Sequence, residues 1–491
     1  MRLVHQDRRD SAWPRGLAPY IAIFCMLHLS GCMLESVKPD LALDTPAKYK
    51  AAHGAADAAV PKLDWWRGFH SRELLTLIEQ AQEHNFDIAI AIAQIKQADA
   101  QVKIDGAPLF PLLTLNGSAT VSQGRASGGS SGGGSSGTTH VYSTSLSASY
   151  VLDFWGKNQS TLVADEESAT ASRYNREVVA LTTISTVATT YFTILGSQDR
   201  LKILHKDLDD SNRILDLIMQ QFKAGTVSQV NVSQQEALVA TLKAQIPPIE
   251  QTLEQNMAAL AVLIGRAPER TVAHGGSMMT TIIPRVTPGL PSELLNQRPD
   301  LRQGEALLAA ANYNVNAARA AFFPSIQLTA QSGFQSAALR TLFGPGAWFY
   351  TAAAAFTQPV FDGFLLEGQL DKELALREQA LQTYRRDVLS AFSDVEKALI
   401  ALEQTTLQEK AQREAVLASQ MAFYLSEQQL REGTVNLVTL LQTEQTLFTA
   451  EDQLTQVQLS RLLAAVGLFQ ALGGGWSPAA TLASTAADAK H

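Results

Sequence analysis

Residues 113–122 read LTLNGSATVS, so that apolar or small side chains alternate with hydroxyl and amide side chains. Successive side chains of a β-strand point to opposite faces, and the pattern therefore predicts a strand with one apolar and one polar face. Residues 141–154, 325–334 and 348–361 follow the same alternation, most weakly in the last segment. About ten residues is the length with which a tilted strand crosses a bilayer. Each segment is therefore a transmembrane strand or part of a soluble hairpin with one buried face.

A membrane barrel built from these strands requires several copies of the chain. The smallest known membrane barrels have about eight strands, and open sheet edges are not tolerated in lipid. The four predicted strands of one chain are too few. Two copies would give eight strands and a nearly filled interior, whereas three would give twelve strands and an open channel.

The chain contains two related halves, which indicates an internal duplication. Three pairs of landmarks recur 208, 213 and 209 residues apart: 221–227 (QFKAGTV) with 429–435 (QLREGTV), 107–111 (APLFP) with 320–324 (AAFFP), and Asp153 with Asp362. We predict repeats at 61–270 and 292–476, a Pro/Gly/Thr-rich connector at 271–291, and a disordered tail at 477–491.

Helical segments surround the predicted strands, which gives an α+β fold. Two proline-free segments, 156–223 and 363–431, predict helices roughly 100 Å long at a rise of ~1.5 Å per residue. Their mixture of Glu, Gln and Lys with Leu, Ala and Val indicates coiled-coil-like pairing, and we expect them to continue a pore away from the membrane. Pro247-Pro248 should kink one of the shorter helices, which are expected at 71–106, 228–265, 292–322 and 436–472.

The N-terminus has the pattern of a secretory signal. A basic head is followed by an apolar stretch at 17–29 and by Leu29-Ser30-Gly31-Cys32. The last four residues resemble a bacterial lipobox. That resemblance implies cleavage of residues 1–31, an S-diacylglycerol and an N-palmitoyl group on Cys32, and a lipid-anchored extended segment at 32–60. The alternative is an ordinary signal peptide with a chance cysteine.

Composition and motifs exclude several classes of function. A net charge of −8 disfavours a basic nucleic-acid-binding face, and two cysteines in 491 residues disfavour a disulfide framework or a thiolate zinc site. No uninterrupted apolar run reaches the ~18 residues of a spanning helix, which argues against a multi-helix carrier. The nine histidines show no paired ligand spacing, and Gly-x-Ser-x-Gly and P-loop motifs are absent. We therefore predict no enzyme, no metal site and no cofactor.

Several local motifs together resemble a known family over about residues 60–476. They are 63–66 (LDWW), 85–88 (NFDI), 153–157 (DFWGK), 297–301 (QRPDL), 318–324 (ARAAFFP) and 471–476 (ALGGGW). With them the chain resembles the outer-membrane efflux proteins of the TolC/OprM/NodT type, and in particular the lipoprotein branch that serves resistance-nodulation-division pumps. The resemblance implies a homotrimer, with a 12-stranded transmembrane β-barrel continued by a periplasmic α-helical barrel. It also implies a periplasmic adaptor protein and an inner-membrane transporter as partners.

The resemblance also suggests where such a channel closes. The family has an apolar constriction and an acidic ring beyond a Gly-Thr tip, and the corresponding positions here are Val438, Thr439 and Gln442. Three amides neither repel one another nor favour cations as three carboxylates would, so we expect no cation selectivity from this ring. Gln442 is alternatively a solvated helix residue. The tip residues Gly225, Thr226, Gly433 and Thr434 should reverse the chain between helices, and the resemblance adds adaptor docking there.

The predicted function is a passive outer-membrane exit duct for drugs or other small toxic compounds, lipid-anchored and extending into the periplasm. The partner pump would supply the energy. The alternatives are a conduit for metal-ion export or type I protein secretion, and a structural coiled-coil surface protein.

Overall fold

A computed structural model describes residues 46, 49–50, 64–125, 136–270, 273, 276–284, 289, 291–474 and 476. The described chain forms two compact units. The sheet unit comprises residues 101–165 and 310–377, and the helical unit comprises the described residues of 40–100, 166–309 and 378–491.

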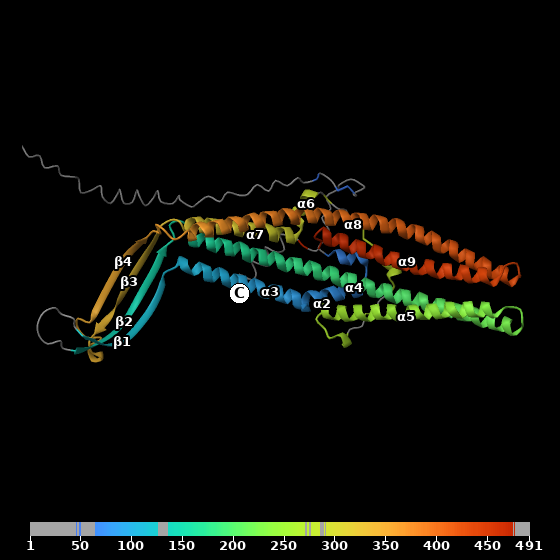
Figure 1. Ribbon diagram of the computed structural model, residues 1–491, viewed down its shortest axis with the longest axis horizontal. Coiled ribbons are helices and arrows are strands. Elements are labelled where there is room, and N and C mark those ends of the chain that lie inside the picture. The colour runs from blue at the N-terminus through green and yellow to red at the C-terminus, as the bar shows by residue number, and fades with distance from the viewer. Residues whose placement is uncertain are drawn as a thin grey trace, which may run out of the picture. The chain divides into compact units, whose positions relative to one another are not determined.

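The sheet unit contains one antiparallel sheet in the order β1-β2-β3-β4 (Figure 1). Its strands are β1 (Leu112–Arg125), β2 (Ser136–Leu152), β3 (Ser325–Ser336) and β4 (Trp348–Thr357). All four predicted strands are confirmed. β4 ends before the predicted residue 361 because Pro359 has no N–H to donate to a neighbouring strand. Among the described residues, β1 and β4 each pair on one side only.

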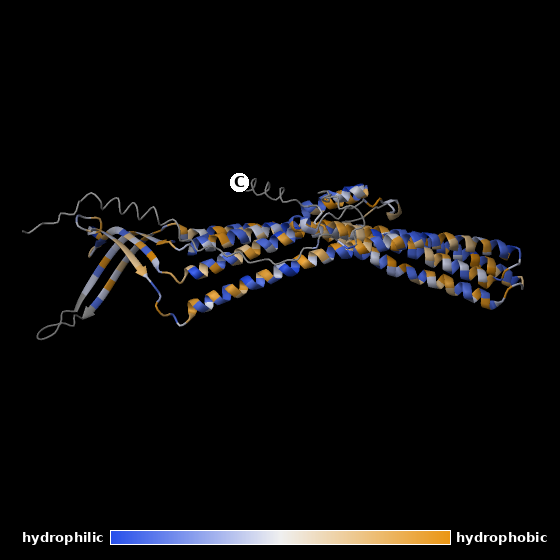
Figure 2. Ribbon diagram, turned by 90° about the horizontal axis from the view of Figure 1, so that it is seen from above, coloured by the Kyte–Doolittle hydropathy of each residue, from blue (hydrophilic) through white to orange (hydrophobic). Residues whose placement is uncertain are grey.

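The two faces of the sheet differ as the alternation predicts. Cross-strand hydrogen bonds link the polar side chains, as between Ser118 Oγ and Ser143 Oγ at 2.8 Å and from Gln331 Nε2 to Ser145 Oγ at 2.8 Å. On the apolar face Leu115 is 78% exposed. Hydrophobic and hydrophilic residues therefore follow one another along the strands (Figure 2). A soluble hairpin with a buried apolar face is the wrong interpretation of these segments, because nothing in the described chain covers Leu115.

Two pairs of helices dominate the rest of the chain. The 67-residue helices α4 (Lys157–Lys223) and α8 (Leu365–Arg431) are followed by the 35-residue return helices α5 (Gln229–Leu263) and α9 (Leu437–Ala471). These bounds confirm the predicted long and short helices to within two residues at each end. One 18-residue window of α4 is apolar enough to span a membrane, with a mean hydropathy of 1.6. Since 56% of that window is buried inside the protein, its composition also suits a core helix.

The two helices that precede the strands are each interrupted, contrary to the prediction of single helices. The first is divided into α2 (Arg72–His84) and α3 (Phe86–Gly106), because Asn85 leaves the helical conformation and its Oδ1 accepts from the backbone N of Asp87 and Ile88. The second is divided into α6 (Pro291–Gln297) and α7 (Pro299–Ala320). There Pro299 occupies the first position of α7, where proline disfavours a helical residue before it.

The sequence predicts a kink at Pro247-Pro248, and the helix is not divided there. α5 runs through both prolines from Gln229 to Leu263. The apolar residues on either side of the prolines, Ile246 and Ile249, pack in a hydrophobic cluster with residues of α4 and α9. This tertiary packing holds the helix together where two backbone donors are missing.

The core of the helical unit begins with the tryptophans of the LDWW motif. They lie in a short 3-10 helix (Trp65–Phe69), and the Trp65 ring stacks on Phe469 of α9 at 4.8 Å between ring centroids. Trp66, Tyr191 and Phe192 belong to the same cluster. The LDWW motif is therefore part of the packing that joins the 3-10 helix to α4 and α9.

Candidate functional site

Both helical hairpins turn through the same local structure. At the first tip Gly225 has a φ of 76° and its N–H donates to Phe222 O, while the N–H of Thr226 donates to Gln221 O at 3.0 Å. This is a Schellman arrangement, in which glycine tolerates the left-handed conformation. The Thr226 hydroxyl also donates to Gln221 O. The second tip repeats every contact, with Gly433 at a φ of 71°, Thr434, Leu430 and Gln429.

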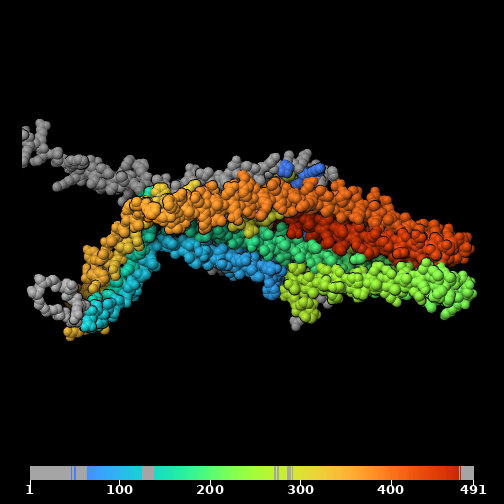
Figure 3. Space-filling model, viewed as in Figure 1, coloured from blue at the N-terminus to red at the C-terminus, as the bar shows by residue number. Residues whose placement is uncertain are grey.

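The two tips lie at the same end of the helical unit, green and orange in Figure 3. A small apolar cluster joins them, in which Ile218 of α4 and Val232 of α5 pack with Leu437 and Leu440 of α9. Each return helix begins with a polar cap: Asn231 accepts from the backbone N of Ser228, and Asn436 accepts from Thr439 N at 3.0 Å. The sequence-predicted tip residues thus form one paired structure.

The predicted constriction residues share an exposed face of α9. Val438 is 47% exposed, and Thr439 and Gln442 are also exposed, whereas Leu437 and Leu440 face the interior. The Thr439 hydroxyl donates to Asn436 Oδ1, so this residue also stabilises the start of α9. The three side chains are therefore available to a space outside this chain.

A buried polar layer, which the sequence does not predict, lies just beyond the tips. Glu444 of α9 is fully buried, and so are Gln235 of α5 and Ser211 of α4. Gln235 Nε2 donates to Ser211 O at 2.9 Å and to Ser211 Oγ at 2.7 Å, which leaves both oxygens of Glu444 and the Gln235 Oε1 without a hydrogen-bond partner among the described residues. The repeat does not reveal this layer, because Glu236, the counterpart of Glu444, is exposed.

Burial changes the acidity of this layer. Burial raises the pKa of Glu444 to about 7, the neighbouring charge of Asp207 raises it further, and Gln235 and Ser211 oppose the rise. Asp207 is itself buried on α4, and burial together with the charge of Glu451 raises its pKa to about 7. Beside it lies a cavity of about 190 Å³ that Arg200 and Asp452 also line. Two carboxyl groups in the helical unit therefore titrate near neutral pH.

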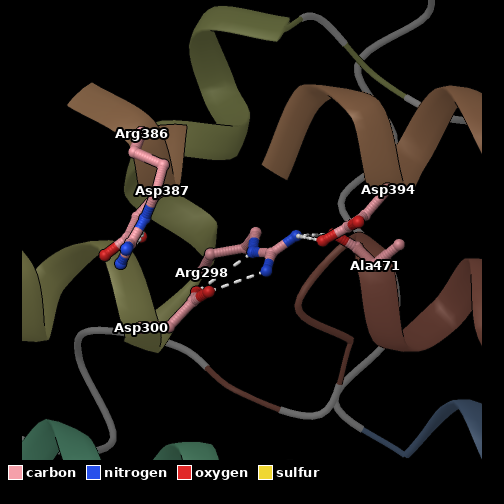
Figure 4. A network of polar contacts seen from close by, with 6 residues as sticks. All are labelled: Arg298, Asp300, Arg386, Asp387, Asp394 and Ala471. Atoms are coloured by element: carbon pink, nitrogen blue, oxygen red, sulfur yellow. Dashed lines mark hydrogen bonds and ion pairs between the residues drawn. The ribbon is translucent and has the colours of Figure 1, made fainter. Parts of the chain in front are cut away.

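The QRPDL motif forms a half-buried junction between helices (Figure 4). Arg298 Nε and Nη2 donate to the two carboxylate oxygens of Asp300 at 3.0 and 2.7 Å. Its Nη1 lies 3.4 Å from both Asp394 Oδ2 on α8 and the backbone O of Ala471 at the end of α9. Burial lowers the pKa of Arg298, but the bonds and charges of Asp300 and Asp394 outweigh it and raise the pKa. Arg298 therefore ties the start of α7 to α8 and α9.

The aspartates that mark the two repeats cap the long helices. Asp153 accepts from the backbone N of Asn158 and Gln159, and Asp362 accepts from the backbone N of Phe364 and Leu366. These bonds satisfy donors that the first turn of a helix leaves free. The sequence landmarks are thus the points where strands pass into long helices.

Leu29, Ser30, Gly31 and Cys32 lie outside the described residues. Within the described residues, no group of three His, Cys, Asp or Glu side chains is placed to hold a metal ion.

An open sheet with an uncovered apolar face, joined to long paired helical hairpins, defines a subunit of a membrane channel. The chain belongs to the outer membrane efflux protein family, whose model matches residues 77–266 and 290–474. The family is non-enzymatic, in agreement with the prediction from the sequence.

Relatives match nearly the whole chain. The pyoverdine export outer membrane protein OpmQ of Pseudomonas putida is 35% identical over 458 residues, which is 92% of this chain and 97% of the relative. OpmQ of Pseudomonas aeruginosa is 36% identical over 457 residues, which is 92% of this chain and 95% of the relative. The cation efflux system protein CusC of Escherichia coli is 28% identical, over 92% of this chain and 98% of the relative. The solved structure of the outer-membrane channel OprN superposes with a TM-score of 0.85 at 25% identity, over 90% of this chain and 100% of that one.

The protein is therefore an outer-membrane efflux channel that extends into the periplasm. It has the fold of this family, with long helices and a four-stranded antiparallel sheet in each chain. It is the outer-membrane component of a tripartite efflux pump. An adaptor and an inner-membrane transporter are therefore implied as its partners.

Proposed function

We propose that three copies of the chain form a homotrimeric exit duct. The observation that supports this proposal is the open sheet, whose apolar face is exposed at Leu115 and whose edge strands β1 and β4 each pair on one side only. In lipid each unpaired backbone group costs several kcal/mol, so the edges must be paired by other copies. Three copies give a barrel of twelve strands, which is wide enough for an open interior. The long helices continue this barrel as an α-helical barrel in the periplasm.

The duct passes drugs or other small toxic organic compounds outward, and a resistance-nodulation-division transporter supplies the energy. The name of OpmQ, a relative that exports pyoverdine, supports an organic cargo. The likeness to CusC, a cation efflux protein, makes metal ions the second candidate cargo.

Two sites on the helical unit serve this function. Val438, Thr439 and Gln442 form the periplasmic constriction, because they share an exposed face next to the tips. The tip residues Gly225, Thr226, Gly433 and Thr434 dock the periplasmic adaptor, because both tips present the same rigid turn at one end of the unit.

The chain is anchored to the outer membrane through its N-terminus. We infer that residues 1–31 are removed and that Cys32 carries the S-diacylglycerol and N-palmitoyl groups, with 32–60 as an extended segment. The repeats at 61–270 and 292–476, the connector at 271–291 and the tail at 477–491 complete the proposed domains. More than one acyl chain is needed for stable anchoring, which the triacylated terminus provides.

Planar-bilayer recordings of the purified protein test the channel. We expect single-channel conductance and an SDS-resistant trimer that dissociates on heating, and a protein that gives neither is not a duct. Deletion of the gene should sensitise cells to a panel of toxic organic compounds. Sensitivity confined to metal cations would instead support the CusC-like cargo, and unchanged susceptibility to both with loss of a secreted protein would support secretion.

A further inference from the structure

In the sheet unit an aromatic contact between Trp155 and Phe323, which we call an aromatic lock, joins the two repeats of the chain. Strand register places Leu152, at the end of β2, opposite Ile326, at the start of β3. The turn after β2 therefore lies beside the turn before β3. There the Trp155 ring stacks on Phe323 at 4.7 Å with an interplanar angle of 22°, and Trp155 Nε1 donates to Pro324 O at 2.8 Å.

The turn before β3, which accepts the Trp155 hydrogen bond, has a counterpart before β1 in the first repeat. No aromatic ring of the described chain covers that counterpart. The duplication pairs 107–111 with 320–324, so that Phe110 corresponds to Phe323. Phe110 is 72% exposed, whereas Phe323 is 39% exposed. Among the described residues, no aromatic ring packs on Phe110.

The turn after β2, which contains Trp155, has a counterpart after β4 in the second repeat. This turn after β4 also projects apolar side chains into open space. Val360, Phe361 and Phe364 are 96%, 82% and 71% exposed. Gly363 and Phe364 have φ values of 68° and 69°, and a bulky residue rarely adopts such a conformation. Asp362 holds it by accepting from Phe364 N and Leu366 N at 3.0 and 2.9 Å. The rings of Phe361 and Phe364 meet edge to face at 6.1 Å, so the strained turn presents a preformed aromatic pair.

Strand direction brings the two exposed turns together in neighbouring chains. β4 ends and β1 begins at the same end of the sheet, because Thr357 pairs with Ser325 and Leu112 pairs with Ser149. If β4 of one copy pairs antiparallel with β1 of the next, as β2 does with β3, the turn after β4 lies beside the turn before β1. Exposed aromatic rings on both turns would then be buried together.

We propose that Phe361 and Phe364 of one chain pack on Phe110 of a second copy and form an inter-chain aromatic lock, which sets the register of β4 against β1. This proposal rests on the proposed homotrimer. The lock inside the chain includes a hydrogen bond from Trp155, whereas the lock between chains is apolar only. The rings of Phe110, Phe361 and Phe364 are exposed in the single chain, so they become buried only when copies assemble.

Cysteine cross-linking of the full-length protein in the outer membrane tests the lock. The chain's own cysteines are Cys25 and Cys32, both in the predicted signal and anchor region. A variant with Phe110→Cys and Phe364→Cys, treated with a short bis-maleimide, should give covalent dimers and trimers on a denaturing gel. Each single variant should give none, because the lock joins different residues of the two chains. The matched control pairs Phe110→Cys with Leu339→Cys, which is 65% exposed beyond the far end of β3 and should also give none.

The outcomes separate this lock from the trimer itself. A heat-dissociable trimer without cross-linking of the Phe110→Cys, Phe364→Cys variant overturns the lock and leaves the trimer standing; it would mean that the rings face lipid. Absence of any trimer in the wild type overturns both. A second variant, Phe361→Ser with Phe364→Ser, should lower the temperature at which the trimer dissociates by several degrees. The variant with Phe361→Leu and Phe364→Leu should keep a dissociation temperature close to that of the wild type, and Leu339→Ser should leave that temperature unchanged.

Discussion

Replacement of the buried Glu444 by glutamine should stabilise the helical unit at neutral and alkaline pH. The wild-type carboxyl is fully buried, and neither of its oxygens has a hydrogen-bond partner among the described residues. When protonated, it carries no charge in this buried layer. When ionised, it places a buried negative charge near Asp207. The glutamine is neutral at every pH and keeps the shape of the protonated acid.

The magnitude follows from proton linkage. The pKa of Glu444 rises from its ordinary value of 4.5 to about 7 on folding, so the folded state binds the proton more tightly than the unfolded state. Stability is therefore full below about pH 4.5, falls as pH rises through about 7, and stays low above it. Since a tenfold change in proton affinity is worth about 1.4 kcal/mol, ionisation costs the helical unit about 3 kcal/mol. Glu444→Gln should remove most of that cost at pH 8 and change little at pH 4.5.

Hydrogen–deuterium exchange of α9 peptides in detergent measures this local stability between pH 5 and 8, after correction for the intrinsic pH dependence of exchange. We expect wild-type α9 to lose protection as pH rises and Glu444→Gln to keep it. The matched control is Glu236→Gln, at the equivalent but exposed position of α5. If Glu444→Gln follows the wild-type profile, or if Glu236→Gln has the same effect, the burial argument is refuted.

Four other substitutions, one of them with a matched control, test the remaining features. Gly433→Ala should destabilise the second hairpin tip by about 1–2 kcal/mol because φ there is 71°, and faster amide exchange at the tip would show it. Arg298→Lys should lower stability by about 2 kcal/mol through loss of the paired bonds to Asp300, whereas Arg386→Lys, at an exposed pair, should change thermal unfolding little. Cys32→Ala should abolish acyl labelling, and persistent labelling would contradict the anchor. Gln442→Asp should raise cation selectivity in bilayer recordings; no change would mean that the side chain does not line the pore.

Local sequence patterns predicted most of the secondary structure. The two-residue alternation located all four strands, and the proline-free segments located α4 and α8, because both depend on side chains close in sequence. The tip glycines were found for the same reason, since a Gly-Thr pair after a helix has a local conformational need. The breaks at Asn85 and Arg298 were missed, although a cap residue and a following proline are themselves local signals.

Burial at the candidate site followed different rules. Glu236 and Glu444 occupy equivalent positions of the repeat, yet only Glu444 is enclosed. The difference arises because Glu444 lies in the interface with Ser211 of α4 and Gln235 of α5, more than two hundred residues away in sequence. Likewise, no local pattern shows that Trp155 is paired with Phe323 while Phe110 is left exposed.

The sequence by itself therefore determined the four strands, the long helices and the return helices, their order, and that one chain has too few strands to close a membrane barrel. Only the tertiary structure decided which carboxyl groups are buried and which aromatic turns are already covered. The physical reason is that strand and helix periodicity are set by neighbours along the chain, whereas desolvation of a charge or a ring is set by segments that meet only after folding.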